Sequence, residues 1–383
     1  MKVGYVPRTG LYQRDANTLH AVAMADALAR KYDGFVLLTP SRFCGRFLKT
    51  SSRLSAEFGS YYGLSGDIDI ARIGCGATLK PGDSHRFRRK FYRRAVRWMQ
   101  RHRVDVFITR AYEIVPLAVD AGLPVILEQH EDPSSPQMRA IEDYVHRDDF
   151  LGLSTISETL KEGYVSTSGL PESKVFVFPD GVSLDRVRRE PLSRSAARDM
   201  LSIPKDVFTV AYVGSLFEYK GITSLLDAAA ELPNVNFLII GDRPFGQVEV
   251  LRNRYREYTN VMFLGHMPNG QVPAYLDAVD CCVLPNSAKH LSARYTSPLK
   301  LFEYMASRRP IIATRIEALD GLLEHERNAY LVPPDSAGDL SRAIETVRIS
   351  PILASRMASN AFDDVVQLTW DCRAKALCEF YGL

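Results

Sequence analysis

The chain contains 383 residues, of which 46% are hydrophobic, and this length favours two domains over one. No apolar run is long enough to cross a bilayer, and Met1 leads directly into a strand-like segment, so we expect neither a membrane span nor a signal peptide. The six cysteines form no C-x-x-C pair, which predicts buried or incidental thiols in a reducing compartment and therefore a cytoplasmic protein.

Positive charge is concentrated in the first half of the chain. The net charge is +3, but residues 1–190 carry 28 Lys and Arg against 23 Asp and Glu, whereas the remainder carries 20 against 22. Nine basic residues and no acidic residue lie within 85–103, where Phe87, Phe91 and Trp98 recur at helical spacing. This pattern predicts a basic amphipathic helix.

Two interpretations of this helix stay open. Its face between Arg86 and Arg103 is either simply solvated or contacts anionic lipid headgroups, which would make the protein peripheral at the inner membrane surface. Nucleic acid is not an expected partner, because no base-stacking aromatics surround this single basic helix.

Short apolar segments alternate with helical patterns from end to end. The first half contains candidate strands at 3–6, 35–39, 68–73, 104–109, 125–128, 151–156 and 175–178. The second half contains candidate strands at 209–213, 236–240, 262–264, 281–284, 310–313 and 329–332. This rhythm predicts an α/β fold of two doubly wound, Rossmann-like domains, each with a parallel sheet between helices. Ligands of such sheets sit at the carboxyl ends of the strands, so we expect the two domains to face across a ligand-binding cleft.

The domain boundary is predicted from the segment 182–200. It holds the end of a P-D-G turn and several charged residues but no strand pattern, so it is the expected linker. We therefore expect a first domain over 1–185, a second domain over 186–365, and a C-terminal helix over 366–383 that packs back on the first domain.

Loops after the second-half strands carry polar residues beside glycines. In GSLFEYKG, Lys220 and Gly221 precede a helix, and although the spacing is not that of a Walker loop, a lysine at a helix N-terminus suits a phosphate as well as solvent. The next two strands end in glycines followed by Asp242 and His266. A parallel sheet would bring these residues to the same edge as Lys220.

The segment SPLKLFE predicts a second phosphate contact. Ser297 suits the N-cap and Pro298 the first helical position, so the amides of Leu299 and Lys300 would point out of the helix end toward an anion. Glu303 shares a face with Lys300 and can accept hydrogen bonds from a vicinal diol such as ribose. The alternative is an ordinary Lys–Glu pair, although the apolar neighbours of Glu303 predict a buried helix.

At these residues the sequence resembles the retaining "group 1" glycosyltransferases (family 4-like) of the GT-B fold. The resemblance covers nearly the whole chain, and it depends on several segments in order: TISETLKEGY, KVFVFPDGVSLDRV, VGSLFEYKG, FLGHM, SPLKLFEYMASRRPIIAT and AYLVPPDSAGDLSRAI. It implies a first domain on the acceptor side and a second domain that binds a nucleotide-sugar donor, with UDP- or GDP-sugars favoured. It also implies retention of the anomeric configuration, a sugar-containing acceptor, and no required cofactor or metal.

The resemblance also implies roles for individual residues. Lys220 would contact the donor diphosphate, the amides after Ser297 the distal phosphate, and Glu303 the ribose. His130, at a first-half strand end in VILEQHEDP, would face the donor sugar, with Glu131 as a candidate base for the acceptor. The remaining assignments are a glycine loop at Gly10, which would approach the sugar and diphosphate, and base-bordering loops at Asp242 and His266.

Two positions depart from the family pattern. Ser215 stands where the pattern G-R-x(4)-K has arginine, and Tyr295 stands where a first glutamate is common, so one phosphate contact and one sugar contact are altered. Arg294 or Arg243 is expected to supply the missing charge. We interpret Tyr295 as a changed sugar pocket; the alternatives are a catalytically impaired nucleotide-sugar-binding protein and a sugar-nucleotide epimerase of the same fold. A D-x-D sequence at 67–69 is interpreted as coincidence.

Overall fold

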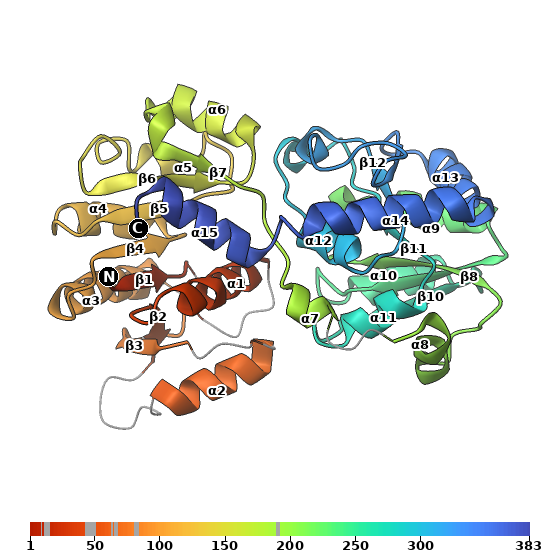
Figure 1. Cartoon of the computed structure of the whole chain (residues 1–383), viewed down its shortest axis with the longest axis horizontal. Coiled ribbons are helices and arrows are strands. Elements are labelled where there is room, and N and C mark those ends of the chain that lie inside the picture. Colours follow the sequence, from red (N-terminus) through yellow and green to blue (C-terminus); the bar gives the residue numbers. More distant parts are fainter. Residues whose placement is uncertain are drawn as a thin grey trace. The chain divides into compact units, whose positions relative to one another are not determined.

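The structure is a computed structural model of the chain, and it describes residues 1–8, 10, 16–42, 51–62, 64, 68–79, 84–188 and 192–383. It divides into two compact units (Figure 1). Unit 1 comprises Met1–Asp180 and Trp370–Leu383, and unit 2 comprises Gly181–Thr369. Among the described residues, no helix combines the length and the hydropathy needed to traverse a bilayer.

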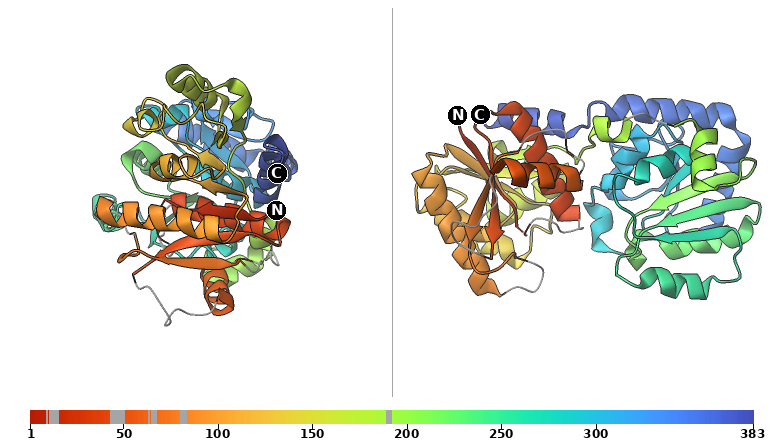
Figure 2. Two further views of the ribbon diagram at one scale, coloured as in Figure 1. Left: turned by 90° about the vertical axis from the view of Figure 1, so that its left-hand side faces the viewer. Right: turned by 90° about the horizontal axis from the view of Figure 1, so that it is seen from below.

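Unit 1 is built on a seven-stranded sheet whose paired strands are all parallel, in the order β3-β2-β1-β4-β5-β6-β7. The strands are β1 Val3–Val6, β2 Val36–Ser41, β3 Ile70–Gly74, β4 Val106–Thr109, β5 Val125–Glu128, β6 Phe150–Thr155 and β7 Val175–Val177. Its helices are α1 Ala16–Lys31, α2 Ser51–Tyr62, α3 His85–Arg101, η1 Tyr112–Ile114, α4 Val115–Val119, α5 Pro136–Arg139, α6 Glu158–Ser168, η2 Glu172–Lys174 and α15 Trp370–Phe380. The last helix, α15, packs along α1, and the views in Figure 2 show both chain ends close together in this unit.

Unit 2 is built on a six-stranded parallel sheet in the order β10-β9-β8-β11-β12-β13. The strands are β8 Phe208–Val213, β9 Val235–Ile240, β10 Val261–Gly265, β11 Cys281–Leu284, β12 Ile311–Thr314 and β13 Tyr330–Val332. Its helices are α7 Leu184–Arg188, α8 Arg194–Leu201, η3 Glu218–Lys220, α9 Ile222–Glu231, α10 Gln247–Arg254, α11 Val272–Ala278, η4 Leu291–Arg294, α12 Leu299–Ala306, η5 Glu317–Leu319, α13 Ala337–Ile349 and α14 Pro351–Val365.

Both faces of the unit 2 sheet are covered, because consecutive strand residues enter different apolar clusters. Cys281 and Val283 pack with α9 and α13, whereas Cys282 and Leu284 pack with α11, α12 and α14. A strand that is apolar on both sides is what a parallel sheet between two helical layers requires. The prediction of two doubly wound α/β units is thus confirmed, and every predicted strand is present with its ends displaced by two residues or fewer.

Two local predictions are wrong. The expected linker at 182–200 contains α7 and most of α8, which begins after its N-cap Ser193; the charged residue Arg198 is buried there against Asp280 at 2.5 Å. Helix α12 begins at Leu299, so Pro298 occupies the N-cap and Ser297 precedes it.

Candidate active site

The carboxyl ends of neighbouring strands in unit 2 are joined by close backbone contacts at glycines. The Gly214 amide donates to the Ile240 carbonyl at 2.9 Å, and the Gly241 amide donates to the Gly265 carbonyl at 2.8 Å. Gly241 has φ +146°, and a Cβ atom there would lie 1.8 Å from the Gly214 carbonyl oxygen. Only glycine permits this approach, so the loops that carry Ser215, Asp242 and His266 are held at one sheet edge.

Lys220 lies at the end of η3, in the loop that follows β8. The next residue, Gly221, has φ +70°, and a Cβ atom there would lie 1.7 Å from the carbonyl oxygen of Pro285, so this loop runs against the loop after β11. The Lys220 Nζ lies 5.2 Å from the ring centroid of Tyr219, and within the described part of the chain it makes no ion pair. Burial lowers the pKa of Lys220 to about 8, so the ammonium is partly desolvated yet still protonated at neutral pH.

An aromatic stack fixes the backbone beside Lys220. The Tyr219 ring stacks between Phe217, with ring centroids 5.5 Å apart, and His290, with ring centroids 4.5 Å apart. The Ser287 amide also donates to the Tyr219 carbonyl at 3.0 Å, which ties the loop after β11 to η3. The sequence gives no periodic indication of this stack, because its rings come from two separate loops.

Helix α12 is attached to β8 by the buried Tyr304. The Tyr304 hydroxyl accepts a hydrogen bond from the Val213 amide at 2.7 Å, which holds the helix against the strand that precedes Lys220. The amides of Leu299 and Lys300 belong to the first turn, where no helical carbonyl precedes them. The phosphate-binding prediction for these amides therefore does not depend on Ser297 as the cap.

Lys300 and Glu303 form an ion pair on the first two turns of α12. Lys300 Nζ lies 2.8 Å from Glu303 Oε2, and their side chains are 20% and 12% exposed. The ordinary pair that the sequence left as an alternative is therefore present. A ribose bound at Glu303 would share this carboxylate with Lys300.

The other predicted donor-binding residues occupy the same edge with distinct contacts. Asp242 Oδ1 accepts from the Val248 amide at 3.1 Å at the start of α10, and His266 is exposed at the end of β10. Tyr295 closes η4 and is half-buried. Asp242 thus has a structural partner in addition to the role that the resemblance implies.

The structure distinguishes the two arginines considered as replacements for Ser215. Arg294 is exposed and pairs with Glu317 at 3.3 Å. Arg243 is half-buried, its carbonyl accepts from the Leu216 amide at 2.5 Å, and its charge opposes the burial that raises the pKa of the Tyr219 hydroxyl. Arg243 therefore lies beside the loop of Ser215 and Lys220, whereas the Arg294 charge already faces a carboxylate.

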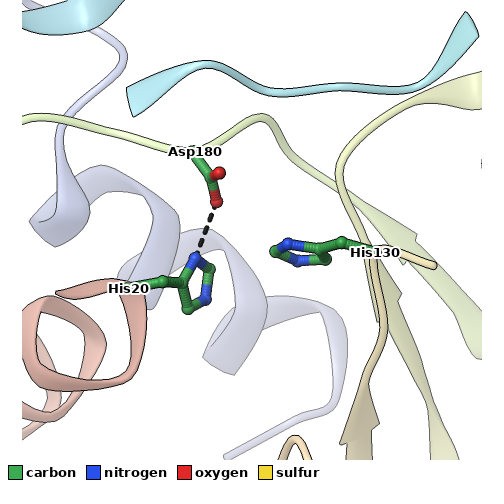
Figure 3. A group of neighbouring side chains, drawn as sticks. All are labelled: His20, His130 and Asp180. Carbon is green, nitrogen blue, oxygen red and sulfur yellow. Dashed lines mark hydrogen bonds and ion pairs between the residues drawn. The ribbon is translucent and has the colours of Figure 1, made fainter. Parts of the chain in front are cut away.

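A buried polar cluster surrounds His130 in unit 1. His20 of α1 contacts two carboxylates: its Nδ1 lies 2.7 Å from Asp180 Oδ1 and its Nε2 lies 2.9 Å from Glu128 Oε1. His130 follows β5, and its ring meets the His20 ring edge-on with centroids 4.8 Å apart. Figure 3 shows the His130 ring directed toward the His20–Asp180 pair.

Charged partners keep both carboxylates ionised. Burial alone would raise the pKa of Glu128, but His20, Arg373 and Arg110 together hold it well below its usual range. Burial likewise opposes ionisation of Asp180, and His20 lowers the pKa of that carboxyl below its usual range. Arg373 NH2 of α15 lies 2.9 Å from Glu128 Oε1, and the Tyr5 hydroxyl donates to Glu128 Oε2 at 3.1 Å.

His20, His130 and Asp180 are close enough to be considered as metal ligands, since each offers an atom within 4.8 Å of the others. Two observations argue against that use. The Asp180 carboxylate already accepts from His20, so a cation would have to break this contact. Arg110 NH2 lies 3.3 Å from His130 Nδ1 and would repel a cation, and burial together with this guanidinium holds the pKa of His130 well below its usual range.

The remaining first-half predictions have structural contacts as follows. A Cβ atom on Gly10 would lie 1.8 Å from the Thr78 carbonyl oxygen, which explains the glycine without a ligand. Glu131 forms an ion pair with Arg8. In the D-x-D sequence, Asp67 lies outside the described residues and Asp69 precedes the amino end of β3, away from the edge where ligands bind.

Three residues of the unit 1 cluster were missed from sequence: His20, Arg110 and Arg373. One pattern could have indicated His20, because it lies among the apolar positions of α1, beside Ala21 and Met24. Such a polar residue on a buried face needs a partner. The partner itself, Glu128, lies more than a hundred residues away and is not encoded in any local pattern.

Residues 207–348 match the family described as "Glycosyl transferases group 1". The alpha-D-kanosaminyltransferase of Streptomyces kanamyceticus is 29% identical over 157 residues, which cover 40% of this chain and 39% of that protein. The D-inositol 3-phosphate glycosyltransferase of Mycolicibacterium smegmatis is 26% identical over 295 residues, covering 75% and 64%. The chain spans about half the length of the first curated relatives that it matches.

Solved structures match over the whole chain. Anabaena HepE in complex with UDP superposes with a TM-score of 0.75 at 18% identity, covering 100% of both chains. The sucrose-phosphate synthase of Thermosynechococcus elongatus gives the same TM-score and identity, covering 100% of this chain and 98% of that one. Residues 207–348 therefore match the group 1 glycosyl transferases in sequence, and the whole chain shares the fold of these two solved structures.

Proposed function

We propose that the protein is a retaining glycosyltransferase that moves a sugar from a nucleotide-diphosphate-sugar to a glycan, lipid-linked or small-molecule acceptor. The observation that carries the proposal is the edge of the unit 2 sheet. There Lys220, a desolvated cation with no ion pair among the described residues, shares the end of β8 with α12, whose first-turn amides and Glu303 suit a phosphate and a ribose.

The proposed chemistry requires little from the protein beyond charge and position. Breaking the anomeric bond develops negative charge on the departing diphosphate, which Lys220 and the α12 amides would stabilise in place. For His130 we propose the role that the resemblance implies, a hydrogen bond to a hydroxyl of the donor sugar that orients the ring. Retention and independence from a metal are parts of this proposal, and they follow from the resemblance.

Arg243 is proposed as the second cation at the diphosphate. It comes from the loop after β9, its backbone bonds to the loop of Ser215, and its charge acts on Tyr219 next to Lys220. It would therefore replace the arginine that the family pattern places at Ser215. A UDP-sugar is the first donor to test, because solved structures of the same fold were obtained with UDP and with UDP-glucose.

The function is tested by incubating the purified chain with UDP-, GDP-, dTDP- and ADP-sugars and measuring nucleotide release. A donor at 100 times its dissociation constant should also stabilise the fold by about 2.7 kcal/mol in a thermal-shift panel. Slow release of UDP or GDP without acceptor supports a transferase. Stabilisation without release would indicate a catalytically impaired binding protein, and a new nucleotide-sugar without release would indicate an epimerase.

The ribose assignment predicts an effect of Glu303→Gln. We expect the affinity for the nucleoside diphosphate to fall by about 1–3 kcal/mol, because a neutral amide mispairs with the diol. Isothermal calorimetry with UDP or GDP measures this loss. Lys300→Gln is the matched control: it removes the same 2.8 Å ion pair but keeps the carboxylate, so it should change affinity by less than about 1 kcal/mol. Equal effects of the two variants would refute the assignment.

We also propose that α3 contacts anionic membranes. Its apolar side is used within unit 1, since Phe91, Tyr92, Ala95, Val96 and Met99 are buried. What faces outward is a set of cations, of which the following are exposed: Arg86, Arg89, Lys90, Arg93, Arg94, Arg97 and Arg101. Such a set attracts an anionic surface by about 1 kcal/mol for each residue near it, without inserting apolar side chains.

Flotation with vesicles tests this surface. Binding to anionic but not neutral vesicles is expected, with loss in roughly half-molar salt, where screening is stronger than at physiological ionic strength. Arg89→Glu with Arg93→Glu should weaken it. The matched control, Arg139→Glu with Arg147→Glu, changes the net charge equally at exposed positions of unit 1 outside α3. It should not weaken vesicle binding. Equal binding to neutral vesicles would leave α3 as a merely solvated helix.

A further inference from the structure

Arg110 is a buried guanidinium without an anionic partner. It follows β4 and is 8% exposed. In the described part of the chain its guanidinium bonds to two neutral groups, Asn17 Oδ1 at 3.1 Å and His130 Nδ1 at 3.3 Å, and NH1 is buried with no hydrogen-bond partner. Buried arginines are ordinarily paired with a carboxylate, and an unpartnered buried donor is costly. This arrangement therefore calls for an explanation.

The carboxylates nearby are already engaged. Glu128 contacts Arg373 and His20, and Asp180 contacts His20. Arg373, the other buried arginine of this cluster, shows the usual arrangement: beside Glu128, it donates to Ser154 Oγ and to the carbonyls of Phe178 and Pro179. The difference between the two arginines is that Arg373 contacts a carboxylate directly, whereas Arg110 acts on Glu128 only at longer range.

A second unpartnered donor lies next to Arg110. Because His130 Nδ1 accepts from the Arg110 guanidinium, the ring hydrogen of the neutral imidazole belongs on Nε2. That Nε2 is also buried without a hydrogen-bond partner. Arg110 and His130 follow the adjacent parallel strands β4 and β5, at the sheet edge where ligands of such folds bind. Together they present hydrogen-bond donors, one of them cationic, that an oxyanion would satisfy.

We infer that Arg110, with His130 beside it, binds an oxyanion carried by the sugar substrate, a carboxylate or a phosphate. That the oxyanion is carried by a sugar rests on the proposed function, whereas the site itself is argued from residues of unit 1 alone. A guanidinium offers two parallel donors that match either group, and its charge would be compensated on binding. The substrate class is therefore an acidic sugar, a uronate or a sugar phosphate, and not a neutral hexose.

The experiment follows the ring nitrogen resonances of His130 by long-range ¹H–¹⁵N NMR in the full chain. Inorganic phosphate and D-glucuronate are titrated in separate arms, with D-glucose as the neutral control. Saturable shifts with phosphate or glucuronate but not glucose are expected, and the stronger arm identifies the kind of oxyanion. Arg110→Met should abolish the shifts. Lys220→Ala should leave them intact, so this site and the proposed nucleotide site can fail independently.

Thermal unfolding separates ligand binding from a structural role. Since Arg110 makes no close ion pair among the described residues and acts on Glu128 only at longer range, Arg110→Met should lower the melting temperature much less than Arg373→Met, the matched control. Three results would overturn the inference: no response of His130 to either anion, an unchanged response in Arg110→Met, or a loss of folding in Arg110→Met comparable to that in Arg373→Met. Arg110→Lys, which keeps the charge but not the paired donors, should retain a weakened response.

Discussion

Replacement of Lys220 by alanine is expected to lower sugar transfer by about 10²-fold or more at saturating donor, the usual effect of removing a preorganised charge from a developing anion. The physical reason lies in the environment of its Nζ. It is half-buried against Tyr219, makes no ion pair in the part of the chain that the structure describes, and has its pKa lowered by burial to about 8. We propose that the diphosphate of the donor binds at this cation. Initial rates of nucleotide release measure the change.

The pH dependence of nucleotide binding provides the control. Around pH 7 the free Lys220 is largely protonated, so its charge adds little pH dependence to the UDP affinity there. As the pH rises above about 8, the free protein loses the proton that diphosphate binding requires, and the affinity should fall by up to about tenfold per pH unit. Lys220→Arg keeps its charge in this range and should bind with little dependence on pH. A change in transfer below threefold for Lys220→Ala, or equal pH profiles for lysine and arginine, would exclude Lys220 from the site.

Much of the unit 2 edge could be predicted from sequence because its determinants are local. The glycines at the ends of β8, β9 and β10, the lysine before a helix and the apolar neighbours of Glu303 all lie within single loops or single helices. The start of α12 could not be predicted to the residue. Ser297-Pro298 is compatible with a helix that begins at Pro298 and with one that begins at Leu299. The hydrogen bond that holds α12 in place, between Tyr304 and Val213, joins residues 91 positions apart.

The unit 1 cluster could not be predicted from local sequence patterns either, because its members are also far apart in the sequence. His130 was identified through the family resemblance, but its neighbours come from α1, β5, the segment after β7 and α15. In sequence, Arg373 stands in WDCRAKALCEF, where an arginine is indistinguishable from a solvated one. Only the packing of α15 within unit 1 shows that the Arg373 side chain is fully buried. Its carboxylate partner, Glu128, is 245 positions away in the sequence.

That burial leads to the second large effect: Arg373→Met is expected to destabilise unit 1 by about 3–5 kcal/mol, the range for removing one partner of a buried ion pair. Methionine fills much of the volume but leaves Glu128 and two backbone carbonyls without their donor. Both tryptophans, Trp98 and Trp370, lie in unit 1, so their fluorescence during urea unfolding reports this unit without interference from the other.

Asp371→Asn, a substitution on the same helix α15, separates the cost of breaking a buried ion pair from the cost of breaking an exposed one. Asp371 pairs with Arg30 at 2.8 Å but its side chain is 61% exposed, so its replacement should cost less than about 1 kcal/mol. Adding Glu128→Gln to Arg373→Met should recover part of the loss, because the stranded charge is then removed. If Arg373→Met is no more harmful than Asp371→Asn, the Arg373–Glu128 pair does not hold α15 in place. Confirmation would mean that a side chain from the last helix fixes Glu128 and, through His20, the surroundings of His130.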